Sequence, residues 1–173
     1  MLYWILMEVG LEAKLNDGFS KKRYERNYLN EYPFKVNYLH GGMHLFETFL
    51  NNEYEIEKLI NDNGNLLMQL QNKINQNIFP LTVVESSSNL KKKKITSNVY
   101  LKRCFNNLKS IKGELFIFGC SFGQDDHIIE AINASGVRDI FVSYRNEASL
   151  VELSEKTNRF NAKVKFFKSE CIF

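Results

Sequence analysis

The sequence is poor in proline, cysteine and glycine, and its net charge is small. It has 2 Pro, 3 Cys and 9 Gly among 173 residues, which excludes a collagen-like chain, a disulfide scaffold and a linker-like chain. Basic residues number 23 against 20 acidic residues, so the surplus is too small to identify a partner by charge alone. The length and the 44% content of hydrophobic residues predict a single domain over residues 1–173 with a buried core.

The cysteines and the first residues indicate the compartment. Cys104, Cys120 and Cys171 are odd in number and show no C-x-x-C spacing, which argues against a disulfide framework and favours a reducing compartment. Residues 1–7 are apolar, but they have no preceding basic region, and Glu8 interrupts them. This segment is therefore neither a signal peptide nor a membrane span. We expect a cytoplasmic protein without membrane contact.

Hydrophobic spacing predicts the elements of the first part of the chain. The expected helices cover residues 2–9, 54–77 with a break at 62–64, and 97–108. The expected strands cover residues 34–39, ending on His40, and 81–84. Residues 86–94 are polar and include Lys91 to Lys94, which we interpret as a solvated loop rather than a nucleic-acid contact.

The clearest pattern lies between residues 114 and 168. Expected strands at 115–118, 139–142 and 164–167 alternate with expected helices that begin at Asp125 and at Glu147. Such a β-α-β-α-β order predicts a parallel sheet with right-handed crossovers. The run of apolar residues at 115–118 also predicts a central strand covered on both faces. The predicted fold class is α/β, Rossmann-like, with a mostly parallel sheet, helices on both faces and an incomplete amino terminus.

Ligands of open parallel sheets bind beyond the carboxyl ends of the strands, so the loops that follow the strands carry the candidate site. The loop after residue 118 holds Ser121 between Gly119 and Gly123. Small residues there allow a ribose or phosphate to approach the backbone. Asp125 and Asp126 favour sugar hydroxyls over phosphate. The alternative is that these glycines only form a tight turn.

The histidines and one cysteine are further candidates. His40 and His44 have the spacing of a metal pair, but Gly41 and Gly42 interrupt the helix that such a pair needs, so we predict no metal site. His40 can act as a general base, or it can be a structural histidine. His127 follows two aspartates at a helix start and is expected to be a helix-cap or hydrogen-bonding residue. Cys120 has no neighbouring base in the sequence, which argues against a nucleophile.

Three segments resemble a bacterial family of uncharacterised proteins that is itself similar to sirtuin-like NAD-consuming domains. These segments are YLHGGMHLF, FPLTVVESSSNLKKKKI and LFIFGCSFGQDDHIIEAINASGVRDIFVSYR, and the resemblance extends over roughly residues 1–146. It implies that His40 is the catalytic histidine that acts on the ribose of NAD. It also implies that the turn Gly119, Cys120 and Ser121 lines the dinucleotide, and that the loop ending at Asn146 lies at its adenosine end.

The chain also departs from the sirtuin-like pattern. Those domains carry a glycine-rich phosphate loop and a Thr-Asn-Tyr-Asp segment before a helix that resembles residues 2–7, and this sequence begins after both. Ser86 also stands where the family tends to have glycine. We expect a truncated NAD-binding domain, related to NAD hydrolases of bacterial antiphage defence and inactive alone. The alternative is a non-catalytic Rossmann-like interaction module. The expected partner is a second copy of the chain or a complementing amino-terminal segment.

Overall fold

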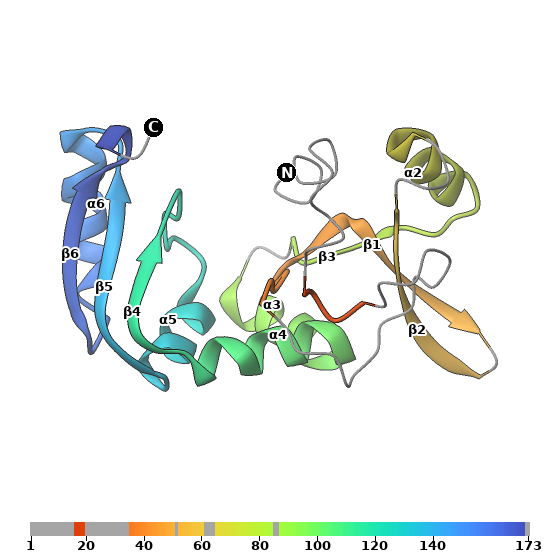
Figure 1. The fold of residues 1–173 in the computed structure, drawn as a ribbon, viewed down its shortest axis with the longest axis horizontal. Helices are drawn as coiled ribbons and strands as arrows, with labels where there is room; N and C mark the ends of the chain where they lie inside the picture. Colours follow the sequence, from red (N-terminus) through yellow and green to blue (C-terminus); the bar gives the residue numbers. More distant parts are fainter. Residues whose placement is uncertain (1–15, 20–34, 51, 61–64, 85–86, 172–173) are drawn as a thin grey trace. The chain divides into compact units, whose positions relative to one another are not determined.

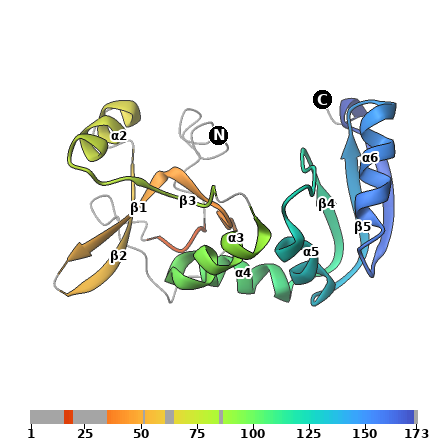
Figure 2. The ribbon, with the colours of Figure 1, turned by 180° about the vertical axis from the view of Figure 1, so that it is seen from behind.

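The computed structural model describes residues 16–19, 35–50, 52–60, 65–84 and 87–171. It divides into two compact units, and each is described by itself (Figures 1 and 2). The first unit comprises Met1–Val84 and Asn98–Cys104, and the second comprises Glu85–Ser97 and Phe105–Phe173. The predicted helix at residues 2–9 lies outside the described residues. The expectation of a single domain stays a prediction.

The first unit contains an antiparallel sheet of three strands in the order β2-β1-β3. Its elements are β1 (Gly41–Leu50), β2 (Glu53–Lys58), α2 (Leu66–Asn75) and β3 (Pro80–Thr82). The β1–β2 connection includes Asn52, whose φ of 65° is a left-handed conformation that asparagine tolerates. Four apolar side chains form a core cluster in this unit: Phe46, Leu59, Leu66 and Leu70.

The prediction of a strand at 34–39 that ends on His40 is wrong. Residues 35–40 lie in bends, coil and a turn, and the strand begins at Gly41. The Gly41 N–H donates to the Tyr38 carbonyl at 2.8 Å and closes the turn. Gly41 has φ +71°, and a Cβ there would lie 1.9 Å from the Leu81 carbonyl oxygen. Only glycine fits so close to β3, so β1 starts after His40 rather than before it.

The long helix expected at 54–77 is confirmed only in its second half, as α2. The first half is β2, in which Ile56 and Lys58 are buried while Tyr54 is exposed. Lys58 is buried because its ammonium pairs with the Asp17 carboxylate at 2.8 Å. This distant partner lets a lysine occupy an inward position of a strand. The predicted strand at 81–84 is confirmed as β3, which ends two residues earlier.

The second unit contains the predicted β-α-β-α-β order, which is confirmed. Its parallel sheet has the strand order β4-β5-β6. The strands and helices are β4 (Lys112–Ile117), α5 (Asp126–Asn133), β5 (Gly136–Tyr144), α6 (Glu147–Thr157), β6 (Lys163–Lys168) and the short helix η3 (Ser169–Cys171). Among the described strands β4 lies at the edge of this sheet, so the loop from Gly119 to Gly123 follows an edge strand, whereas we expected a central one.

The expected helical cover on both faces of the parallel sheet is not found in the described residues. Ile140 and Val142 of β5 pack in one cluster with residues of both α5 and α6, so both helices lie on one face. Two right-handed crossovers in the same direction produce this arrangement. On the other face Phe116 and Phe118 are 54% and 48% exposed. The fold is a mixed α/β fold with a three-stranded parallel sheet flanked by helices, besides the antiparallel sheet.

The prediction of a loop at 86–94 is wrong for the residues from Ser88 onward, which form most of α3 (Ser88–Ser97). Its contacts are with α5: Lys91 pairs with Asp125 at 2.8 Å and Lys92 with Glu130 at 2.6 Å. Lysine is a good helix former, and these distant carboxylates complement the charge of the run. The helix predicted at 97–108 is confirmed as α4 (Val99–Ser110). Among the described residues, no helix is both long and apolar enough to cross a bilayer.

Candidate functional site

A pocket of about 430 Å³ lies at the carboxyl ends of the strands of the parallel sheet. All of its lining residues belong to the second unit: Phe118, Gly119, Cys120, Ser121, Ser143, Tyr144, Arg145, Ser149, Glu152, Leu153 and Ser169. They come from the loop after β4, the end of β5, the first turns of α6 and the residue after β6. The structure thus brings Gly119, Cys120 and Ser121, which the sequence singled out, to the wall of one pocket.

The loop from Gly119 to Gly123 has an unusual backbone. Gly119 has φ +63°, and a Cβ added there would meet no protein atom within 4 Å. Phe122 has φ +53° although it is not glycine, and its side chain is only 1% exposed. Its ring packs edge-on against Phe160 at 5.4 Å, and Arg159 Nη2 donates to its carbonyl at 3.1 Å. Burial and this hydrogen bond hold a conformation that a bulky residue rarely adopts.

Three of the four serine hydroxyls that line the pocket form hydrogen bonds with the backbone around it. The Oγ of Ser143, which is 7% exposed, accepts from the Gly119 N–H at 3.4 Å. Ser149 Oγ accepts from the Arg145 N–H at 3.2 Å, and Ser169 Oγ donates to the Tyr144 carbonyl at 2.7 Å. The Ser143 bond uses an oxygen lone pair and leaves the hydroxyl proton to donate. These bonds join all three strand ends into one wall.

Asn146 does not line this pocket but begins α6. Its Oδ1 accepts from the Ser149 N–H at 2.9 Å, and Ser149 Oγ accepts from the Asn146 N–H at 3.0 Å. This reciprocal pair is a capping box. Asn146 therefore shapes the loop that carries Arg145 and Ser149, and its predicted direct contact with a ligand stays a prediction.

Two ionisable lining residues and one thiol set the electrostatics of the pocket. The Glu152 carboxylate pairs with Lys156 Nζ at 2.5 Å, and Arg145 is exposed at the end of β5. Burial raises the pKa of the Cys120 thiol, and the Asp125 carboxylate adds to this effect. The thiol is therefore protonated at neutral pH, which argues against a reactive thiolate.

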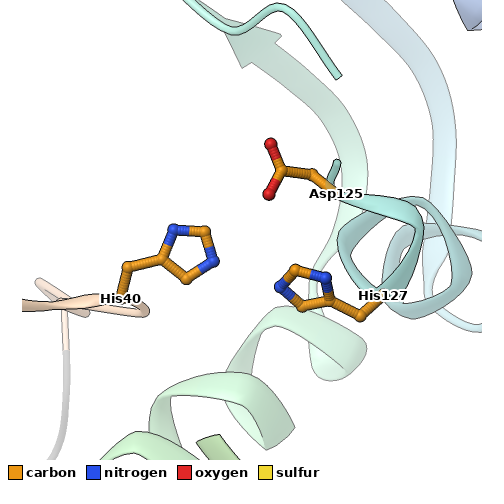
Figure 3. A group of neighbouring side chains, drawn as sticks. All are labelled: His40, Asp125 and His127. Atoms are coloured by element: carbon orange, nitrogen blue, oxygen red, sulfur yellow. The ribbon is translucent and has the colours of Figure 1, made fainter. Parts of the chain in front are cut away.

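The histidines occupy three different environments. His127 is 1% exposed. Its ring Nδ1 lies 2.9 Å from Ser88 Oγ, and its backbone N–H donates to the same oxygen at 2.8 Å. It therefore makes buried hydrogen bonds with Ser88 at the start of α5, and Figure 3 shows its side chain there together with that of Asp125. His44 is buried in β1 at 4.6 Å from the Tyr38 ring. Its burial and the Lys58 ammonium lower its pKa to about 3.

His40 belongs to the first unit and precedes β1 (Figure 3). Its carbonyl accepts from the Val83 N–H at 3.0 Å. The pocket residues belong to the second unit. The expectation that His40 and Ser121 share one side of a sheet, and the catalytic role of His40, stay predictions.

Sequence reasoning missed the contribution of α6 and of the residue after β6. Ser149, Glu152, Leu153 and Ser169 all line the pocket. Ser169 directly follows a strand, so the rule applied to the other strand ends would have found it. The α6 residues required knowledge that α6 packs beside the β4 loop, which no local pattern provides.

The fold and the pocket define an α/β protein with a ligand-sized pocket at the carboxyl edge of a parallel sheet. The chain belongs to the family described as Domain of unknown function (DUF4917), whose model matches residues 1–172. No curated protein and no solved structure matches the chain.

Proposed function

We propose that the second unit is a Rossmann-like ligand-binding module whose pocket takes the ribose of a nucleotide, with NAD as the first candidate. The observation that carries this proposal is the pocket of about 430 Å³ at the carboxyl ends of β4, β5 and β6. Open parallel sheets bind their ligands at this edge. The volume also lies within the range of roughly 300 to 1,000 Å³ common for small-molecule sites.

The composition of the wall supports a nucleoside. Phe118, Tyr144 and Leu153 provide apolar surface on which a base can pack. Ser121 and Ser143 provide hydroxyls that can bond a sugar. At Gly119 a side chain is absent and the surrounding space is open, so a ligand can approach the backbone. The wall thus combines apolar packing with a few polar groups.

The lining residues favour binding over turnover of NAD. No histidine is among the residues that line the pocket in the described part of the chain. The Cys120 thiol has a raised pKa because it is buried, so it is a weak nucleophile at neutral pH. A histidine that acts as the general base would have to lie within hydrogen-bond reach of the reacting group. We therefore propose a binding module related to NAD-consuming sirtuin-like domains, inactive as an isolated chain.

Gly119 and Gly113 provide a matched test of the pocket. Both have positive φ, +63° and +85°, and an added Cβ would meet no protein atom within 4 Å at either position. Valine at each should therefore cause similar backbone strain, but only Gly119 lines the pocket. We expect Gly119→Val to weaken NAD and ADP-ribose binding at least about tenfold, roughly 1.4 kcal/mol. Gly113→Val should retain the affinity.

Isothermal titration calorimetry on the full chain measures this comparison, and far-ultraviolet circular dichroism confirms that both variants are folded. Equal affinities of the wild type and Gly119→Val would contradict the proposed pocket. Equal losses in both variants would point to general destabilisation instead. Absence of any binding by the folded wild type would remove NAD and ADP-ribose as ligands.

The exposed aromatic face of the parallel sheet favours a second candidate, a protein-interaction module that pairs two copies of the chain. Phe116 stacks on Phe141 at 4.6 Å, and Phe118 contacts Phe167 at 5.3 Å. Lys165 pairs with Asp139 on the same face at 3.0 Å, so charges of both signs are present, which suits a second copy better than a nucleic acid. Sedimentation of the wild type and of Phe116→Ser should show a dimer that the variant loses. A monomeric wild type at all concentrations would exclude this candidate.

A further inference from the structure

We propose that Glu152 accepts the 2′- and 3′-hydroxyls of the bound ribose and that Arg145 binds the phosphate on its 5′ carbon. The pocket would then select nucleoside 5′-phosphates over isomers that carry the phosphate on the 2′ oxygen. This inference rests on the proposed function and names the ligand class of the same pocket.

Glu152 lies in the pocket wall with one carboxylate oxygen left to accept a hydroxyl. Its Oε1 is held by Lys156 Nζ at 2.5 Å. Its Oε2 has no hydrogen-bond partner among the described residues, and the side chain lines the pocket. Lys156 Nζ also lies 4.0 Å from the position of a Cβ on Gly123, so the pair lies beside the loop that follows β4. A carboxylate has only acceptor sites and can bond two adjacent hydroxyls.

Arg145 is the cationic residue of the pocket wall. Its N–H bonds to Ser149 Oγ at 3.2 Å, which fixes the backbone from which the side chain extends. Its guanidinium makes no hydrogen bond or ion pair with the part of the chain that the structure describes. A guanidinium is always charged, and its fork of donors matches phosphate oxygens.

The spacing of these two residues fits a nucleotide. Glu152 lies seven positions after Arg145, and α6 begins at Glu147. Arg145 and the extended cap residue Asn146 precede the helix, and a rise of roughly 1.5 Å per residue places Glu152 about 7.5 Å along the helix from Glu147. The flexible side chains of arginine and glutamate shorten that gap. A sugar with a 5′-phosphate can therefore present its diol to Glu152 while its phosphate meets Arg145.

Other charges near this edge disfavour a phosphate at the starts of the helices. Asp126 lies in the first turn of α5 and Glu147 in the first turn of α6. Carboxylates at these positions already interact with the positive end of the helix dipole. A phosphate on the 2′ oxygen would also replace a hydroxyl donor at Glu152 Oε2 with a group that has no proton to donate. Among the lining residues, Arg145 is then the favourable partner for a phosphate.

The experiment compares adenosine 5′-monophosphate with adenosine 2′-monophosphate, which have the same composition and charge. Calorimetry on the full chain should show that the 5′ isomer binds at least about tenfold more tightly. Glu152→Gln should reduce this preference, mainly through tighter binding of the 2′ isomer. Arg145→Gln should weaken the 5′ isomer toward the affinity of adenosine.

Glu155→Gln is the matched control, because Glu155 is an exposed carboxylate on the same helix and does not line the pocket. It should leave the preference unchanged. Equal effects of Glu152→Gln and Glu155→Gln would show a long-range charge effect and overturn the inference. Equal binding of both isomers by the wild type would overturn it while the proposed function stands. If neither isomer nor NAD binds, the proposed function and this inference both fail.

Discussion

The left-handed conformation of Phe122 leads to a prediction about substitution by small residues. Alanine is usually tolerated better than glycine, and the order should be reversed at this position. Phe122 has φ +53° and is 1% exposed. Its partner Phe160, 8% exposed, belongs to the same cluster and does not have a positive φ. Truncation of either ring removes a large buried side chain, which costs about 3 to 5 kcal/mol for alanine. The two sites should differ in whether alanine or glycine is tolerated better.

The backbone decides that order. Alanine in the left-handed region costs about 1 to 2 kcal/mol, whereas glycine adopts it freely. Glycine loses about 0.5 to 1 kcal/mol relative to alanine through the entropy of the unfolded chain. At position 122, Phe122→Gly should therefore be more stable than Phe122→Ala by up to about 1.5 kcal/mol. At position 160, Phe160→Gly should be less stable than Phe160→Ala by about 0.5 to 1 kcal/mol.

Urea unfolding of the four variants, read by pulsed hydrogen exchange of peptides from β5 (Gly136–Tyr144), measures the second unit alone. Alanine and glycine at the same position leave nearly the same cavity, so comparing them cancels most of the free energy lost through that cavity. The same order of alanine and glycine at both positions would refute the left-handed conformation of Phe122. It would also refute the shape of the loop that forms one wall of the pocket.

Two further predictions concern the first unit and the activity of the chain. Burial and Lys58 lower the pKa of His44 from 6.5 to about 3, so below pH 6.5 the unfolded chain takes up a proton that the native chain does not. The free energy of unfolding should then fall as the pH drops toward 3, by at most about 1.4 kcal/mol per pH unit. His44→Gln should lose this contribution to the pH dependence of the free energy of unfolding. Urea unfolding at several pH values, read by hydrogen exchange of β1, measures it. The full chain should release nicotinamide from NAD negligibly, and brisk release that His40→Ala abolishes would show a catalytic histidine instead.

Local patterns predicted the second unit better than the first. The apolar run at Leu115 and the helix-start residues at Asp125 and Glu147 agree with the strand or helix that each forms. At Gly41, by contrast, the start of the strand is set by a close approach of Leu81, which lies 40 positions away. Lys91 lies in a helix whose neighbouring carboxylate, Asp125, comes from another segment. Long-range contacts of this kind leave no periodic trace in the sequence.

The candidate site could be predicted where it depends on strand ends, and not where it depends on contacts between distant segments. The rule that ligands bind beyond strand ends pointed to Gly119, Cys120 and Ser121, and all three line the pocket. The same rule gave a wrong setting for His40, because the strand assumed to precede it is absent and β1 is antiparallel to both neighbours. Glu152 required the packing of α6 beside the loop after β4. Its role depends on tertiary structure, so the spacing of residue types could not reveal it.

The most direct test of the proposed binding site is a nuclear magnetic resonance titration of the isotope-labelled full chain with NAD. Binding in the pocket predicts saturable shifts of the amide signals of Gly119, Ser121, Ser143 and Arg145, with Gly113 as an internal reference that does not shift. The same titration of Gly119→Val should show no saturation over that range. Saturable shifts confined to residues outside the pocket, or no shifts at all, would contradict the proposal.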